Sequence, residues 1–269
     1  MLPQKFKDFF DSQVKKWDTA RNNYESLDLV QTKRFRLKDL KGLVQYNPAR
    51  SVSSLAKVDR TTIEKRRCFL CEKNRPPQQE SIEIIPGWEL LVNPYPIMPY
   101  HFTICSKEHK AQRIDLEIGK ELAAILDGMI VFYNDEGAGA SAPDHAHFQA
   151  VPKESLPLIS LIEEYKANSL KNIDLPFKFY TKENDIYRDH SPMNIYFWKV
   201  PSKEIKIIGV PRRAHRPKEY YLSLPYRKTI SPGAIDIAGV LVTPYEEDFQ
   251  SISEEDIESI YSQVTYLDE

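Results

Sequence analysis

The sequence feature that most constrains the fold is the segment 137–149, which reads GAGASAPDHAHFQ. A run of small and turn-forming residues opens it, and two of the six histidines of the chain follow one residue apart. If the end of the segment is a β-strand, alternation places His145, His147 and Gln149 on one face, and Ala146 and Phe148 on the other. Polar ring and amide groups beside a loop with exposed backbone N–H groups suit a phosphate. The segment therefore predicts a strand that packs on one face and binds phosphate on the other.

Composition limits the classes of partner. The chain has 269 residues, of which 41% are hydrophobic, and a formal net charge of −2. This length and apolar content predict a sizeable core in one or two domains. There is no basic excess, no apolar run of membrane-spanning length and no signal-peptide core, so we expect neither nucleic-acid nor membrane binding. Three cysteines with one Cys-x-x-Cys pair indicate a metal or redox site in a cytoplasmic protein, not a disulfide framework.

The spacing of apolar residues predicts a mixture of helices and strands. Helical spacing is found over residues 5–26, 114–133, 157–170 and 253–264. Strand-like runs cover 27–30, 35–46, 82–85, 88–93, 101–105, 144–151, 177–180, 193–200, 205–210, 220–222 and 235–242. A polar surface loop is expected over 51–67. A strand followed by basic residues and a histidine occurs at both 102–109 and 207–215, which indicates either a duplicated unit or a chance echo.

Cys68 and Cys71 have the spacing of a zinc knuckle, in which one tight turn brings two thiolates to one ion. No second Cys-x-x-Cys pair exists, so histidines have to supply the remaining ligands. The candidates in the same half of the chain are His101, His109, His145 and His147. The alternatives are an unliganded buried pair of cysteines and a thioredoxin-like redox motif. The second is disfavoured because the βαβ context of such motifs is absent.

Residues 68–109 resemble the first half of the histidine-triad (HIT) superfamily. The shared pattern is Cys-x-x-Cys, two strands, an Asn–Pro-rich link, a strand that opens at Pro-x-His101, and a closing Lys-x-His109. Some members contain zinc, among them galactose-1-phosphate uridylyltransferases. The resemblance to them implies that this chain has a structural Zn²⁺ with four protein ligands. By position these ligands would be Cys68, Cys71, His109 and His145. His101 would then shape the pocket.

The spacing His145-x-His147-x-Gln149 is similar to that of the transferase and phosphorylase branch of this superfamily. That branch includes hexose-1-phosphate uridylyltransferases, diadenosine tetraphosphate phosphorylases and GDP-hexose phosphorylases. The resemblance implies that His147 attacks the α-phosphorus of a nucleotide and becomes covalently nucleotidylated. Gln149 would donate to a phosphate oxygen and favour transfer over hydrolysis. Substrate contacts would come from Gly139, Ser141 and Asn134. The structural alternative is a pair of satisfied core histidines.

Two flanking blocks resemble GDP-galactose phosphorylases. Residues 45–50 read QYNPAR, and residues 231–239 read SPGAIDIAG. The first block implies that Asn47 and Arg50 approach the nucleotide, although Arg50 equally fits a surface salt bridge. Arg227 and Lys228 precede the second block and fit either an acceptor-phosphate site or solvated surface charge.

We therefore expect an α+β fold with a HIT-like antiparallel sheet and flanking helices, built as a degenerate tandem repeat. Its parts would be an N-terminal helix and strands (1–67), a catalytic unit with the zinc knuckle (68–155) and a second half that completes the sheet (156–269). The predicted enzyme is a nucleotidyltransferase or phosphorylase. Its substrate would be a nucleoside diphosphate sugar or dinucleoside polyphosphate, with phosphate or a sugar phosphate as acceptor. The alternatives are a HIT-type hydrolase and a zinc-stabilised nucleotide-binding protein without catalysis. A duplicated unit would function as a monomer, and a single unit would pair as a homodimer.

Overall fold

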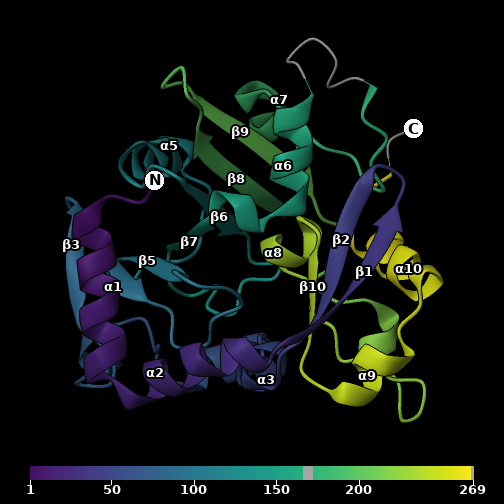
Figure 1. Cartoon of the computed structure of the whole chain (residues 1–269), viewed down its shortest axis with the longest axis horizontal. Helices are drawn as coiled ribbons and strands as arrows, with labels where there is room; N and C mark the ends of the chain where they lie inside the picture. Colours follow the sequence, from purple (N-terminus) through teal and green to yellow (C-terminus); the bar gives the residue numbers. More distant parts are fainter. Residues whose placement is uncertain (166–171, 268–269) are drawn as a thin grey trace.

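The computed structural model describes residues 1–165 and 172–267, in which the strands form two sheets (Figure 1). The larger is a seven-stranded antiparallel sheet in the order β3-β4-β5-β7-β6-β8-β9, and the smaller has the order β1-β2-β10. The large sheet consists of β3 (Ser81–Ile85), β4 (Trp88–Val92), β5 (Phe102–Ser106), β6 (Met129–Asn134), β7 (His147–Pro152), β8 (Met193–Lys199) and β9 (Ile205–Pro211). Antiparallel pairing with flanking helices confirms the predicted α+β class.

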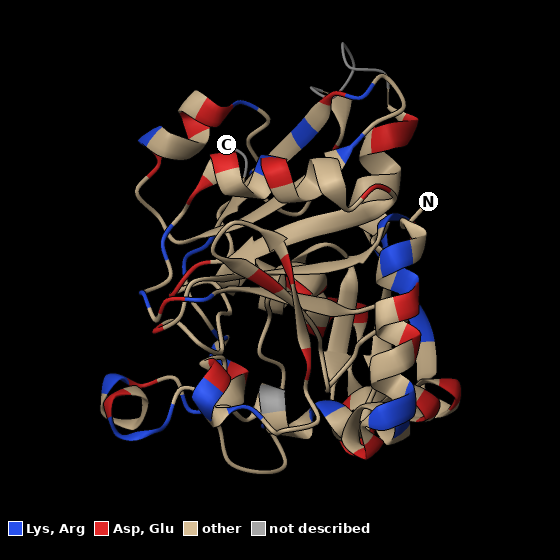
Figure 2. Cartoon of the chain, turned by 90° about the vertical axis from the view of Figure 1, so that its left-hand side faces the viewer, with Lys and Arg blue, Asp and Glu red and all other residues tan. Residues whose placement is uncertain are grey.

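Helices α1 (Gln4–Lys16) and α5 (Leu116–Ile125) cover one face of the large sheet. Phe6 and Phe10 of α1 and Leu122 of α5 join a buried cluster with Trp88 and Phe148 from the strands. Figure 1 shows α1 beside β3, and α2 (Asp18–Glu25) continues the chain from it. Figure 2 shows that charged residues lie mainly on helices and loops, whereas the strands of the large sheet carry few. Apolar burial therefore holds this face together.

The second core lies on the opposite face, over β6, β8 and β9. Here the β1–β2 hairpin (Gln31–Leu37 and Leu40–Tyr46) pairs with β10 (Val240–Thr243) from the far end of the chain, and β2 and β10 run parallel. Figure 1 shows the hairpin beside β10 and α10. The helices are α6 (Pro157–Glu164), α7 (Glu183–Arg188), α8 (Ala234–Ile237), α9 (Glu246–Ser251) and α10 (Glu254–Val264). The N-terminal hairpin and C-terminal third thus form one layer.

The register of β7 positions the motif. In its pairing with β5, His147 lies opposite Cys105 and Gln149 opposite Thr103. Phe148 belongs to the core beneath α1 and α5, as does Ala146 just before the strand, which confirms the predicted alternation. The polar face of β7 therefore points away from α1 and α5. On that side of the sheet the second core contains no residue of β4 or β5.

Several local predictions were wrong. The helix expected over 114–133 ends at Ile125. Gly128, with a φ of +79°, leads into β6, whose residues are all buried. A continuous apolar run that is buried on both faces has no strand periodicity, so its spacing resembled a helix. The expected strands over 27–30 and 220–222 are short 3₁₀ turns, and 235–242 divides into α8 and β10. Residues 177–180 keep only a bridge at Tyr180.

The loop expected over 51–67 contains two short helices, α3 (Ser51–Ser54) and α4 (Arg60–Lys65). Part of the helix predicted over 157–170 lies outside the described residues. Five strands of the large sheet come from 68–155 and two from 156–269, and the tandem repeat and these boundaries remain predictions. No helix in the two described ranges is long and apolar enough to span a membrane.

Candidate active site and metal centre

The loop between β6 and β7 is held in shape by its own backbone. The N–H groups of Ala138 and Ala140 donate to the carbonyl of Asp135, at 2.9 and 3.4 Å. Gly139 has a φ of +96°, and a Cβ there would lie 2.6 Å from Cα of Gly233, so only glycine fits. Neither Gly139 nor Ser141 forms a hydrogen bond within the described residues, and both line the same cavity. Their polar groups are thus available to a ligand.

Buried Gln112 fixes the start of β7. Its Oε1 accepts from the His147 N–H at 2.7 Å, and its Nε2 donates to the carbonyls of His147 at 2.9 Å and Asn134 at 2.8 Å. One side chain therefore joins the end of β6 to the beginning of β7. The sequence interpretation missed Gln112 because these bonds reach across the fold, and nothing in its local sequence marks them.

His147 is held as a neutral imidazole. Its Nδ1 lies 2.8 Å from the carbonyl oxygen of His145, so this nitrogen carries the proton and donates. Nε2 keeps its lone pair and has no hydrogen-bond partner within the described residues. Burial lowers the pKa of His147 to about 4, so the ring is uncharged at neutral pH. A neutral imidazole with a free nitrogen at a cavity wall is a competent nucleophile.

His101 orients Gln149. The backbone N–H of Ile97 donates to Nδ1 of His101 at 3.3 Å, so Nε2 of His101 carries the ring proton. That nitrogen lies 2.8 Å from Oε1 of Gln149 and donates to it. Burial, helped by the charge of Arg50, lowers the pKa of His101 to about 3 and keeps the ring neutral. The amide NH₂ of Gln149 is therefore the part left to act as a donor in the cavity.

Asn134 ends β6, not the helix that the sequence predicts there, and lines the cavity. Its Oδ1 accepts from Nδ2 of Asn194 at 2.9 Å and from the N–H of Ala234 at 2.7 Å. Fully buried Arg212 donates to Asn194 Oδ1 at 2.6 Å and to the Pro232 carbonyl at 3.0 Å. This network connects the loop after β6 to the segment before α8, and its carbonyl and amide acceptors hold a buried cation.

These groups surround one cavity of about 470 Å³, a volume typical of small-molecule sites. His147, Gln149, Asn134, Gly139 and Ser141 line one wall. The residues that complete the cavity include apolar side chains and polar ones from the C-terminal third, namely Trp17, Phe69, Leu70, Leu91, His215, Arg216, Ser231 and Asp236. The cavity lining thus combines apolar and polar side chains.

The predicted N-terminal contacts divide in two. Arg50 lines the cavity and donates from Nη1 to the Tyr95 carbonyl at 2.6 Å, and it forms no salt bridge within the described ranges. Asn47 is buried outside the cavity wall, where its amide nitrogen donates to Gln45 at 3.2 Å and to the Pro96 carbonyl at 3.1 Å. The structure therefore places Arg50 with the site and Asn47 in the support beneath it.

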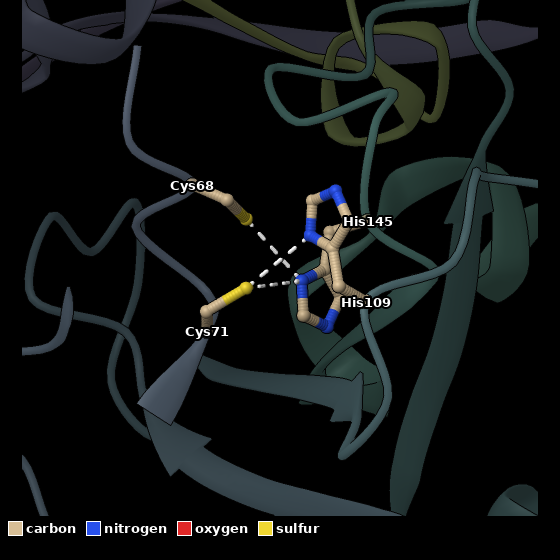
Figure 3. A group of neighbouring side chains, drawn as sticks. All are labelled: Cys68, Cys71, His109 and His145. Atoms are coloured by element: carbon tan, nitrogen blue, oxygen red, sulfur yellow. Dashed lines mark hydrogen bonds between the residues drawn. The ribbon is translucent and has the colours of Figure 1, made fainter. Parts of the chain in front are cut away.

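Cys68, Cys71, His109 and His145 form a cluster that could hold a metal ion (Figure 3). Their four ligand atoms all lie within 4.8 Å of one another. Sγ of Cys68 lies 3.2 Å from Nδ1 of His145, and Sγ of Cys71 lies 3.2 Å from Nδ1 of His109. Ligand atoms around a tetrahedral zinc ion are roughly 3.3–3.8 Å apart, so both the donor set and its spacing fit such an ion.

Surrounding groups orient this cluster. Nε2 of His145 donates to the Ser106 carbonyl at 2.7 Å, which leaves Nδ1 to face the thiols. Asn74 donates to the Cys68 carbonyl at 2.8 Å, and Arg66 forms an ion pair with Asp144. The cysteine loop and the histidine segment are thus connected by more than the cluster itself.

Comparison with known proteins gives one matching family and several solved structures with a similar fold. Residues 9–152 match the family described as "Domain of unknown function (DUF4922)". The chain belongs to this family. None of the curated proteins matches the sequence.

Among solved structures, the chain is similar to yeast Ap4A phosphorylase Apa2, with a TM-score of 0.62 and 14% identity over 99% of each chain. The same yeast enzyme in complex with Ap4A gives a TM-score of 0.60 and 15% identity, again over 99% of each chain. Its complex with AMP gives 0.57 and 14%, over 99% of this chain and 98% of that one. At such identities the similarity shows a shared fold.

Proposed function

We propose that this DUF4922 protein is a nucleotidyltransferase or phosphorylase that acts through a covalent nucleotidyl-His147 intermediate. The observation that carries the proposal is the tautomer of His147. Its Nδ1 donates to the His145 carbonyl, so the unprotonated Nε2 is the nitrogen left at the cavity. A histidine kept only for packing would not require a neighbouring cavity with hydrogen-bond donors suited to phosphate.

The reaction has two displacements. Nε2 of His147 attacks the α-phosphorus, an N–P bond forms, and the bond from phosphorus to the leaving phosphate oxygen breaks. An acceptor phosphate oxygen then attacks the same phosphorus, and the N–P bond breaks to restore the imidazole. The Gln149 amide, the Ser141 hydroxyl and the Gly139 N–H would donate to the non-bridging oxygens as charge accumulates there. The Gln149 amide can donate a hydrogen bond but cannot give up its proton at neutral pH. A phosphate is therefore favoured as the leaving group, because it needs little protonation.

The fold supports a dinucleoside polyphosphate as the first substrate to test. The yeast enzyme with the same fold is an Ap4A phosphorylase, and its structures include complexes with Ap4A and AMP. A nucleoside diphosphate sugar is the second candidate, because the same α-phosphorus chemistry releases a sugar phosphate. The cavity in this chain offers apolar side chains for a flat base and polar ones for phosphates.

Zn²⁺ is the metal that the cluster fits, with Cys68, Cys71, His109 and His145 as ligands. When bound, it would stabilise the connection between the cysteine loop and the start of β7. Four protein donors leave no coordination position for substrate, so its role is structural. Nδ1 of His147 donates to the His145 carbonyl, so the residue that would bind the metal also orients the proposed nucleophile.

The test is a product analysis with Ap4A and a panel of nucleoside diphosphate sugars, each with and without inorganic phosphate. Phosphate-dependent formation of a nucleoside diphosphate, abolished in His147→Ala, supports the phosphorylase. The matched control is His190→Ala, which removes an exposed histidine outside the cavity wall. Release of nucleoside monophosphate at the same rate without phosphate would instead indicate the hydrolase. Tight binding with no turnover would leave a nucleotide-binding protein.

A further inference from the structure

We infer that Arg216 and Ser231, with Arg50, form a second anion subsite in the cavity. It would hold the phosphate group that leaves during the first displacement and the one that attacks during the second. This inference rests on the proposed function and adds to it the residues that recognise the acceptor. Arg227 and Lys228, which the sequence offered for this role, do not line the cavity, and Lys228 donates to Ser251 instead.

The charges around the cavity single out two cations. Within the described residues, its cationic side chains are Arg50, Arg75 and Arg216. Arg75 is already neutralised, because its Nη2 lies 2.8 Å from the Glu89 carboxylate. Arg50 and Arg216 form no ion pair in the described part of the chain. Positive charge without a directly paired carboxylate, at the wall of a cavity that His147 also lines, favours an anionic ligand.

Arg216 is built into the wall. Its Nε donates to Ser231 Oγ at 2.8 Å, and its Nη2 donates to the Ala56 carbonyl at 2.7 Å. The guanidinium also lies over the ring of Tyr220, 4.1 Å from the ring centre. These contacts hold the cation in place while Nη1 makes no hydrogen bond with described residues. A fixed guanidinium with donors to spare is suited to phosphate recognition.

Ser231 and Arg50 complete the subsite. Because Ser231 Oγ accepts from Arg216, its hydroxyl proton can be donated to a ligand, with His215 Nε2 at 3.5 Å as the other nearby partner. Arg50 reaches the same cavity from the end of the β1–β2 hairpin, and its buried Nε has no hydrogen-bond partner among the described residues. Two guanidinium groups and a hydroxyl from segments distant in the sequence thus line the same cavity.

The acid that lines this cavity acts on the charge of Arg50 from a distance but forms no ion pair with it. Asp236 lines the cavity, but its two carboxylate oxygens accept from the backbone N–H groups of Gly233 and Val242, both at 2.9 Å. It forms no ion pair with Arg50 or Arg216. Its role is to shape the segment before and after α8.

The reaction geometry requires such a subsite. In an in-line displacement the leaving oxygen departs from the side of phosphorus opposite the nucleophile, and the acceptor oxygen later approaches from that side. One set of cations therefore serves both steps. His147 comes from β7, whereas Arg216 and Ser231 come from the segments after β9, so the two halves of the chain would supply the nucleophile and the acceptor contacts respectively.

The test measures binding of inorganic phosphate to the His147→Ala protein, by calorimetry or ³¹P NMR, so that covalent chemistry plays no part. Adding Arg216→Gln or Arg50→Gln should weaken phosphate binding about 10- to 100-fold, the range for losing a hydrogen bond to a charged group. Arg227→Gln, the matched control, should leave it unchanged. Arg216→Lys should lie between, since it keeps the charge and loses the planar donors.

Two results would overturn the subsite: no phosphate binding at millimolar concentration, or equal binding in the Arg216→Gln, Arg50→Gln and control proteins. Thermal unfolding of each variant shows whether a loss reflects the site or the fold, and the Arg50 variant serves where Arg216→Gln is unfolded. Failure of the proposed function is seen separately, as absence of nucleotide transfer in the wild type. Phosphate binding at these arginines does not depend on that result.

Discussion

His145 and His147 are one residue apart, yet they face different chemistry. His145 donates from Nε2 to the Ser106 carbonyl and turns Nδ1 towards two thiols. His147 donates from Nδ1 to the His145 carbonyl and keeps Nε2 for the cavity. The two rings therefore hold opposite tautomers. In each case the backbone carbonyl within reach decides which nitrogen is free, and this decides whether the ring suits a metal or a phosphorus centre.

The largest expected effect is on activity. His147→Ala should lower turnover by roughly 10⁴-fold or more, as expected when a covalent nucleophile is removed. Metal content and thermal stability should stay close to those of the wild type, because His147 is not part of the cluster. Turnover with Ap4A and metal analysis of the same preparation check both parts. Substantial turnover in His147→Ala would contradict the assignment of His147 as the nucleophile.

The second prediction concerns the cluster of cysteines and histidines that contains His145. Cys68→Ser should lose the metal, and with it at least about 3 kcal/mol of stability, the contribution of a ligand present at several hundred times its Kd. For a chain of this size we expect Tm to fall by roughly 6–12 °C. Cys105→Ser is the matched control, because Cys105 is buried nearby but lies outside the cluster. Elemental analysis and thermal unfolding are the measurements.

A metal-free wild type of unchanged stability would contradict the zinc assignment. Equal metal loss in Cys68→Ser and Cys105→Ser would show that the effect is on folding and not on ligation.

A smaller effect is expected from Gln149→Ala. Removing one donor to the developing charge should slow nucleotidyl transfer about 10²-fold, with the metal retained. His101→Phe should act through the same amide, because it frees Gln149 to rotate, and it should slow transfer less than Gln149→Ala. Single-turnover rates measured for the two variants separate the orienting residue from the donor. A larger loss in His101→Phe would assign His101 a direct role.

The smallest effect is in the pH profile. Burial lowers the pKa of His147 to about 4 from its ordinary value of 6.5, so the ring loses its nucleophilic lone pair only when the pH falls towards 4. Initial rates of nucleotidyl transfer should thus be nearly constant between about pH 7 and pH 5, and decline below that. A decline centred near pH 6.5 would show that His147 is solvated like a free histidine.

The sequence predicted what local spacing can encode. Alternation placed Phe148 in the core and His147 and Gln149 on the opposite face. The cysteine spacing with the family resemblance assembled the same four residues that the structure brings together. The helix expected over 253–264 is also present as Glu254–Val264, and the Ser253 hydroxyl before it accepts from the Asp256 N–H.

Other features depend on contacts that no local pattern encodes. Gln112 bonds to the backbone of His147, and Arg216 joins the 51–58 segment to Ser231, across the fold in both cases. The strand β6 resembled a helix because burial on both faces removes its periodicity. Sequence reasoning therefore singled out the histidine that we propose as the nucleophile and the four residues that the structure brings together, whereas the walls of the cavity required the tertiary structure.

The most direct test of the central claim is to trap the intermediate. Wild-type protein would be incubated with Ap4A without phosphate, quenched in base, and analysed by intact mass and peptide mapping. We predict one nucleotidyl group per chain on His147, stable to base, labile to acid and discharged by added phosphate. Absence of the adduct in His147→Ala and its presence in His190→Ala would support the account. An adduct on any other residue, or turnover of Ap4A with no adduct at all, would contradict it.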